Sequence, residues 1–140
     1  MRLIVDTGRI IAALIRDSAA RRILFSDKFE FLTVNFAKSE ISEHEQEIVR
    51  KAKLSKTEFD SVLSLLLDHV KIVSDLLIDP KIGEARAIMH DIDPDDVPFI
   101  AAALAVENGV WTDDAHFKRQ NVIRVYSTAT LLEIISDLGS

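Results

Sequence analysis

Leu3-Ile4-Val5-Asp6, close to the start of the chain, is the stretch of sequence that decides the fold. Its three apolar residues are too few for a helix and too uniformly apolar for a strand with one exposed face, so they predict a buried strand. A helical pattern follows at once, with Thr7 as a candidate N-cap and apolar residues at positions 10, 11 and 14 on one face. A buried strand that runs straight into a helix is the repeating unit of a parallel α/β sheet.

Four further short apolar runs repeat this pattern along the chain. They predict strands over residues 30–34, 70–73, 110–112 and 122–126, and one or two helical segments separate each strand from the next. Parallel strands need such long crossovers, and the crossover helices then cover both faces of the sheet. We therefore expect an α/β protein of three layers, α/β/α, around a central parallel five-stranded sheet.

The helical segments carry their own start and stop signals. A single long polar helix is expected from Asn35, with a buried stripe at positions 37, 41, 48 and 52. Ser55 and Glu58 have the spacing of a capping box at the start of the next helix. A later helix begins near Pro94 and is expected to end at residues 108–109, Asn-Gly, a common C-terminal stop.

The composition is that of one ordinary globular domain over residues 1–140, with 48% hydrophobic and 29% charged residues. The net charge of −6 argues against a nonspecific binder of duplex DNA, which usually has a basic face, without excluding other nucleic acids. The absence of cysteine excludes disulfides, cysteine-based zinc sites and thiol nucleophiles. No apolar run suits a signal peptide or a membrane span, so we expect a cytoplasmic protein without membrane contact.

Three carboxylates stand at the ends of apolar segments. Asp6 closes the first predicted strand, Asp114 follows the strand at 110–112, and Asp96 lies at the start of an alanine-rich helix. If the first and fourth strands are neighbours, their carboxyl ends bring these acids together. Clustered carboxylates repel one another unless a cation holds them, so the pattern predicts a metal site. The alternatives are a helix N-terminal acid for Asp6 and, after an Asp93 N-cap, a first-turn acid for Asp96.

Four segments of the chain resemble those of PIN-domain ribonucleases, the VapC-like toxin nucleases and related stand-alone PIN proteins. They are Val5-Asp6-Thr7, the helix around Glu40, the run 93–105 with Asp96 as the matching acid, and the run 111–117, which matches Thr-x-Asp-x-x-Phe at Thr112, Asp114 and Phe117. The chain departs from the family at Gly8, where an Asn usually follows Asp-Thr or Asp-Ala. That Asn would support the first acid, and loss of such a partner commonly costs about 10–100-fold in metal affinity or activity.

The resemblance implies a metal-dependent endoribonuclease that hydrolyses RNA phosphodiester bonds. It assigns catalysis and the binding of Mg²⁺ or Mn²⁺ to Asp6, Glu40, Asp96 and Asp114, with Thr112 and Asp113 in support. It favours Asp114 over Asp113 as the ligand, and it selects Glu40 from a polar helix whose other acids indicate a solvated face. It also implies an RNA substrate, a role as the toxin of a toxin–antitoxin pair with a small antitoxin partner, and a homodimer.

Basic residues near these segments are candidates for binding RNA. Arg9 lies in the first turn of a helix, where a cation opposes the helix dipole. Contact with a substrate phosphate would explain that placement, and so would surface chance. Lys118 and Arg119 follow the last acidic segment and could meet an RNA backbone.

Other interpretations stay open on the sequence alone. The chain could be a catalytically weak PIN module that binds RNA or protein, which Gly8 favours. A phosphohydrolase of the haloacid-dehalogenase type fits poorly because it needs a second acid at that position, and a receiver domain fits no better. Among the histidines, His44 follows Glu40 by four residues and could share a metal with it, although a place beside the apolar stripe is the simpler account. His116 has no partner at ligand spacing, so we assign it no role.

Overall fold

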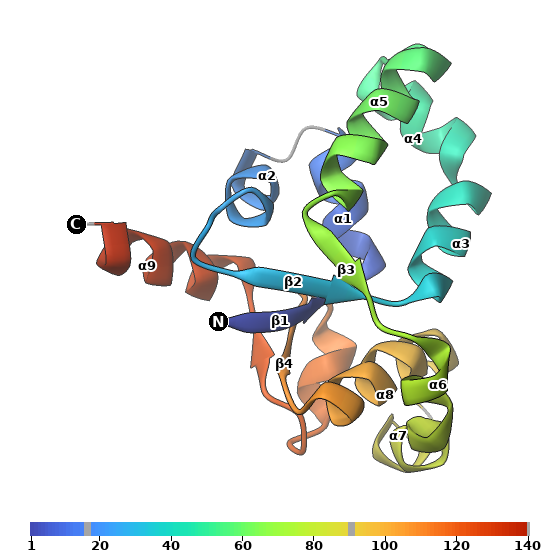
Figure 1. The fold of residues 1–140 in the computed structure, drawn as a ribbon, viewed down its shortest axis with the longest axis vertical. Helices are drawn as coiled ribbons and strands as arrows, with labels where there is room; N and C mark the ends of the chain where they lie inside the picture. Colours follow the sequence, from blue (N-terminus) through green and yellow to red (C-terminus); the bar gives the residue numbers. More distant parts are fainter. Residues whose placement is uncertain (16–17, 90–91, 140) are drawn as a thin grey trace.

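The computed structural model describes residues 1–15, 18–89 and 92–139, which contain a sheet of five parallel strands. The strands are β1 (Arg2–Val5), β2 (Glu30–Thr33), β3 (Val70–Ile72), β4 (Gly109–Trp111) and β5 (Val125–Tyr126). Their order in the sheet is β3-β2-β1-β4-β5, so β1 lies at the centre (Figure 1). The predicted parallel five-stranded sheet is confirmed.

The strand order reverses at β1. Leu3 pairs with Phe31 of β2 on one side and with Gly109 of β4 on the other. Parallel sheets bind ligands beyond the carboxyl ends of the strands at such a reversal. The first and fourth strands are therefore neighbours, which is the condition on which the predicted meeting of Asp6 and Asp114 depended.

Helices cover both faces of the sheet. One face carries α1 (Thr7–Ile15), α2 (Ser18–Leu24), α4 (Glu45–Ala52), α5 (Lys56–Leu67) and α9 (Thr128–Gly139). The other face carries α6 (Asp75–Ile78), α7 (Ile82–Met89) and α8 (Val97–Val106), while α3 (Asn35–Glu43) contributes to both cores. Figure 1 shows α1, α2, α4 and α5 on one side of β1 and β2, and α6, α7 and α8 on the other. The short 3-10 helices are η1 (Asp79–Lys81), η2 (Pro94–Asp96) and η3 (Ala115–Arg119).

The central strand supplies side chains to two separate cores. Leu3 and Val5 pack into the core beneath α1, α2 and α5, whereas Ile4 packs into the core beneath α7 and α8. Successive side chains of a strand point to opposite faces, so a strand covered on both sides must be apolar throughout. This is the three-layer α/β/α arrangement that the sequence predicted. Within the described residues, no helix has the length and apolar character required to cross a membrane.

The single long helix predicted from Asn35 is wrong. The chain leaves helical geometry at His44 (φ −101°, ψ 10°), which divides the segment into α3 and α4. The predicted stripe is nevertheless buried at positions 37, 41, 48 and 52. Neither Gly nor Pro marks the break. We attribute it to packing, because α4 lies against α1 and Ile48 reaches the same core as Ile10.

Two of the predicted helix ends also differ. Asp6, and not Thr7, caps α1, since its Oδ1 accepts a hydrogen bond of 2.9 Å from the Arg9 amide. The residue in left-handed geometry after α8 is Glu107 (φ 56°), while Gly109 lies within β4. The predicted capping box of Ser55 with Glu58 is present.

Candidate metal centre

An acidic cavity of about 410 Å³ lies beyond the carboxyl ends of β1 and β4. All four predicted ligands line it, together with three further acids. The lining residues are Asp6, Thr7, Gly8, Arg9, Glu40, Asp93, Asp95, Asp96, Phe99, Asp113 and Asp114. The cavity therefore gathers carboxylates from segments that are far apart in the sequence.

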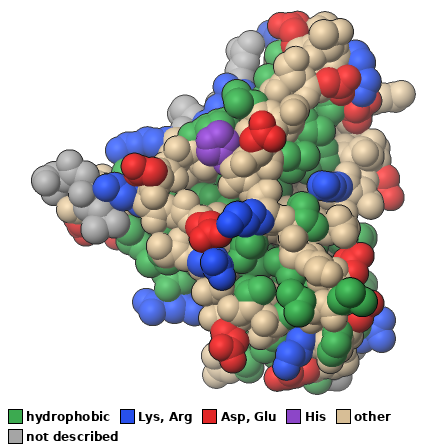
Figure 2. All heavy atoms as spheres, in the orientation of Figure 1, with side chains coloured by type: hydrophobic (Ala, Val, Ile, Leu, Met, Phe, Trp, Pro, Cys, Tyr) green, Lys and Arg blue, Asp and Glu red, His purple; other side chains and the backbone are tan. Residues whose placement is uncertain are grey.

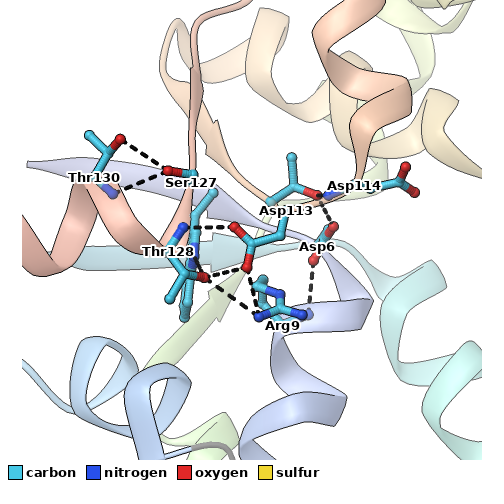
Figure 3. Close-up of polar contacts among 9 residues, drawn as sticks. Asp6, Arg9, Asp113, Asp114, Ser127, Thr128 and Thr130 are labelled. Atoms are coloured by element: carbon cyan, nitrogen blue, oxygen red, sulfur yellow. Dashed lines mark hydrogen bonds and ion pairs between the residues drawn. The ribbon is translucent and has the colours of Figure 1, made fainter.

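Asp6 is held by two donors where β1 passes into α1. Its Oδ1 accepts a hydrogen bond from the Arg9 amide (Figure 3), and its Oδ2 accepts one from the hydroxyl of Thr112. The same Thr112 hydroxyl accepts a bond of 3.0 Å from the Asp114 amide. Burial raises the pKa of Asp6 and repulsion from Asp114 adds to it, while the bonds from Thr112 and Arg9 oppose the rise. The predicted supporting position of Thr112 thus corresponds to a direct contact.

Glu40 reaches the cavity from α3. Its Oε1 accepts a hydrogen bond of 2.5 Å from the Thr7 hydroxyl, at the start of α1. Burial raises the pKa of this carboxyl, and the charge of Asp95 raises it further. The hydrogen bond from Thr7 acts in the opposite direction and lowers the pKa. Glu40 is therefore not a residue of the solvated helix face, in contrast to exposed Glu43 on the same helix.

Asp96 ends η2 at the start of α8 and is only 8% exposed. Asp93 caps this turn by accepting a 2.9 Å bond from the Asp95 amide, which is the arrangement that the alternative account of Asp96 as a first-turn acid assumed. Burial raises the pKa of Asp96 to about 7, with repulsion from Asp93, Asp114, Asp6 and Asp95 contributing in that order. A buried carboxyl surrounded by like charges gives up its proton only at the expense of this repulsion.

Asp113 and Asp114 point in different directions (Figure 3). Both oxygens of Asp113 accept from Thr128, at 2.8 Å from its amide and 2.6 Å from its hydroxyl. Asp114 instead caps η3, where its Oδ1 accepts a 2.9 Å bond from the His116 amide. Burial alone would raise the pKa of Asp113, but the Thr128 bonds and the charges of Arg9 and Lys118 lower it. Asp114 is thus the member of the pair that adds charge beside Asp6 and Asp96.

The predicted basic residues separate into two groups. Arg9 lines the cavity, and its guanidinium pairs with Asp113 at 2.9 Å and lies 3.5 Å from the Thr128 hydroxyl. Lys118 and Arg119 are exposed on η3 and do not line the cavity. Arg9 is accordingly oriented by the protein itself, whereas the other two cations lie outside the cavity lining.

Sequence reasoning missed one histidine beside the cavity, His116. The ring Nδ1 of His116 lies 3.5–3.8 Å from carboxylate oxygens of Asp93, Asp96 and Asp114. Only its separation of two residues from Asp114 hinted at this, because Asp93 and Asp96 lie far away along the chain. His44, by contrast, is exposed near Glu47 and does not line the cavity.

The cavity residues fit a divalent cation that prefers oxygen ligands. Raised pKa values at Asp6, Glu40 and Asp96 indicate carboxyls whose ionisation is opposed by burial and mutual repulsion. The Oδ2 atom of Asp96 is buried and has no hydrogen-bond partner within the described residues. A bound cation relieves both conditions, and Mg²⁺ and Mn²⁺ favour carboxylate oxygens.

Comparison with known proteins identifies the family. A family model described as PIN domain matches residues 4–132. One similar solved structure is that of VapBC2 from Rickettsia felis bound to a DNA fragment from their promoter, with a TM-score of 0.70 and 16% identity over 91% of this chain and 98% of that one. No curated protein sequence matches the chain. At that identity the structural likeness shows the fold, and the match over residues 4–132 shows the family. The chain belongs to the PIN domain family.

Proposed function

We propose that this protein is an endoribonuclease that uses Mg²⁺ or Mn²⁺ and hydrolyses phosphodiester bonds of RNA. Membership of the PIN domain family supports a nuclease. The observation that carries the proposal is the convergence of Asp6, Glu40, Asp96 and Asp114 on one cavity. These are hard oxygen donors on separate elements, which is what phosphoryl chemistry with a divalent cation requires.

The four carboxylates would hold the cation, and their neighbours would keep them oriented. The bound ion supplies polarisation of a phosphate and a more acidic water. The Thr112 hydroxyl and the Arg9 amide hold both oxygens of Asp6, and the Thr7 hydroxyl holds one oxygen of Glu40. Preorganised ligands of this kind lose little free energy to reorganisation when charge builds up during the reaction.

Arg9 is the cation best placed to contact the RNA phosphate. Asp113 and Thr128 hold its guanidinium at the cavity, so the side chain loses little conformational freedom on binding substrate. Asp113 in this proposal supports Arg9 and does not bind the metal. Lys118 and Arg119 would contact the RNA backbone outside the cavity. Because these contacts neutralise phosphate charges, the RNA affinity that they contribute should fall as the salt concentration rises.

We further propose that the protein acts in the cytoplasm as the toxin of a toxin–antitoxin pair, as a homodimer bound by a small antitoxin protein. The structural likeness to VapBC2, which was solved bound to a DNA fragment from its promoter, supports a partner of this kind. Light scattering of the purified chain tests the dimer. A small reading frame for a DNA-binding protein directly upstream of the gene tests the pair.

Cleavage of a mixed RNA substrate tests the enzyme. We expect cleavage with Mn²⁺ or Mg²⁺ that stops on addition of a chelator and in Asp6→Asn. Glu40→Gln is expected to lose activity as well, whereas Glu43→Gln, an exposed acid on the same helix, is expected to keep it. Cleavage that survives Asp6→Asn would mean that the carboxylate cavity is not the catalytic site.

A catalytically weak module that binds RNA or protein is the second candidate, and Gly8 is the observation that favours it. A Cβ at this position would lie 3.6 Å from Oδ1 of Asp6, so there is room for a side chain that supports Asp6. Glycine provides no such side chain. Titration with Mn²⁺ separates the two functions. A chain that binds no Mn²⁺ near millimolar concentration would have a binding role only.

A further inference from the structure

Asp96, one of the four carboxylates, also forms a group with Asp93 and His116 that combines oxygen and nitrogen ligands. We propose that Asp93, Asp96 and His116 form a second cation subsite, in which the imidazole favours Mn²⁺ or a similar transition metal over Mg²⁺. Asp96 belongs to both sites, so the inference rests on the proposed function for that one residue. Asp93 and His116 are additional to the predicted ligands.

The distances suit one shared ion. One ligand atom from each of Asp93, Asp96 and His116 can be chosen so that all lie within 4.8 Å of one another. His116 Nδ1 is 3.8 Å from Oδ2 of Asp93 and 3.7 Å from Oδ2 of Asp96. Ligands about 2.1 Å from an ion stand about 3 Å apart when adjacent and about 4.2 Å apart when opposite. Small side-chain rotations therefore bring all three atoms into coordination.

Unmet hydrogen-bonding capacity at the same point is an independent indication of a ligand. Oδ2 of Asp96 and Nδ1 of His116 are both buried, and within the described residues neither has a hydrogen-bond partner. Their mutual distance of 3.7 Å is too long for a hydrogen bond. Buried polar atoms in folded proteins nearly always have a partner, and here the Asp96 oxygen belongs to a residue only 8% exposed.

The position of His116 is set by the anchoring of η3. Asp114 caps its first turn, and Phe117 is 1% exposed in the core beneath α8. At its far end the Gln120 amide group donates to the carbonyls of Phe117 and Ile123 and accepts from the Ile123 amide. A short segment held at both ends and in the middle keeps its histidine in place, and such preorganisation favours binding.

The imidazole gives this subsite its selectivity. Mg²⁺ demands oxygen ligands, whereas first-row transition metals readily accept imidazole nitrogen. A subsite of two carboxylates and one histidine therefore discriminates between ions that the all-oxygen centre would treat alike. This selectivity determines which ion is bound and through which atoms, and not whether RNA is cleaved.

Pulsed electron paramagnetic resonance on bound Mn²⁺ provides the test, because it detects a nitrogen that coordinates the ion. We expect nitrogen coupling in the full-length protein, loss of that coupling in His116→Gln, and its retention in the control His44→Gln. The His116 side chain is 39% exposed, so the glutamine should be accommodated. Labelling histidine with a different nitrogen isotope reads out the same coordination without any substitution.

Affinities provide the second readout. Loss of a residue that only supports a ligand typically weakens metal binding about tenfold or more. Loss of the direct ligand in His116→Gln should therefore weaken Mn²⁺ binding at least as much, and it should weaken Mg²⁺ binding less. Bound Mn²⁺ without nitrogen coupling, or coupling that persists in His116→Gln, would overturn the subsite and leave the proposed nuclease intact. Nitrogen-coupled Mn²⁺ in a chain that cleaves no RNA would support the subsite and refute the nuclease. Absence of any Mn²⁺ binding would overturn both.

Discussion

At the scale of single residues, the Thr112 hydroxyl connects two acids of the cavity. It donates its one proton to Asp6 and accepts from the Asp114 amide, and the residue is fully buried. The donor of a hydroxyl rotates freely until its partners fix it. With both partners in place, Thr112 sets the separation between the end of β1 and the segment that follows β4.

Replacing Thr112 by valine tests this connection. Thr112→Val keeps the shape but leaves a buried carboxylate oxygen without its donor, which should cost about 1–3 kcal/mol of stability. Metal affinity should fall about 10–100-fold. Thr33→Val is the matched control, since the Thr33 hydroxyl is equally buried and donates to the Val5 carbonyl at 2.8 Å. Urea unfolding and Mn²⁺ titration should show stability loss in both variants and affinity loss only in Thr112→Val.

Gly8 offers a gain-of-function test at the same scale. The space beside Asp6 admits a side chain at ordinary contact distance, 3.6 Å from Oδ1. Gly8→Asn should therefore raise metal affinity, by up to about 10–100-fold if the amide supports Asp6. Gly83→Asn makes the same exchange in α7, where no described atom beyond the neighbouring residues and the backbone of the helix itself lies within 4 Å of the added Cβ. Equal Mn²⁺ affinities for wild type and Gly8→Asn would exclude this supporting role.

At the scale of elements, β4 and β5 approach each other closely at Gly109. A Cβ there would lie 2.8 Å from the Tyr126 ring and 2.9 Å from the Arg124 carbonyl oxygen. The guanidinium of Arg124 lies over the same ring, 5.1 Å from its centroid. Gly109 is thus required by the approach of another strand, and not by the helix end that its sequence position indicated.

Alanine at this position should force the two strands apart. Gly109→Ala is expected to destabilise the protein by about 1–3 kcal/mol, the usual penalty of overpacking. Gly83→Ala, in the open surroundings of α7, should instead stabilise by about 0.4–1 kcal/mol because the unfolded chain becomes less flexible. Thermal unfolding of both variants provides the measurement, and a stabilised Gly109→Ala would contradict the close approach.

At the scale of the whole molecule, folding concentrates negative charge. Acids from the end of β1, from α3, from η2 and from the segment after β4 bring their carboxylates to one cavity: Asp6 directly follows β1, and the net charge of the chain is −6. Without a cation, this repulsion opposes folding. A ligand that binds only the folded state stabilises it, by about 2.7 kcal/mol at one hundred times its dissociation constant.

Because the pKa of Asp96 is raised to about 7, the contribution of this residue to the destabilisation of the folded state depends on pH. Below the unfolded pKa both states hold the proton, so Asp96 has no effect on stability. Between that pKa and about 7 the folded state keeps a proton that the unfolded state loses, and stability therefore falls as pH rises. The destabilisation is fully developed above pH 7.

Asp96→Asn should remove this dependence. In chelator, we expect the variant to exceed wild type in free energy of unfolding by up to about 3 kcal/mol at pH 8, with the gap shrinking toward pH 4. Saturating Mn²⁺ should close or reverse the gap at pH 8, because the ion stabilises wild type more. Urea titrations across this pH range make the measurement, and a gap independent of pH would refute the shifted titration.

The secondary-structure elements and the residues of the cavity were predictable from the sequence to different degrees. The strands were visible because burial on both faces demands uninterrupted apolar residues, and the Ser55 capping box was visible because it is local. The break at His44 was not, since the contact of α4 with α1 produces it. Asp6, Asp96 and Asp114 were found as acids at element ends, and Glu40 only through likeness to the family.

The sequence by itself determined a parallel α/β fold and the carboxylates at its strand and helix ends. The spacing of apolar residues and the residues at the ends of each element are sufficient for both. Only the tertiary structure decided what each acid contacts. It turned Asp113 toward Arg9 and Thr128, and it brought His116 against Asp93 and Asp96. Such contacts join residues distant along the chain, and their geometry follows from how helices and strands pack.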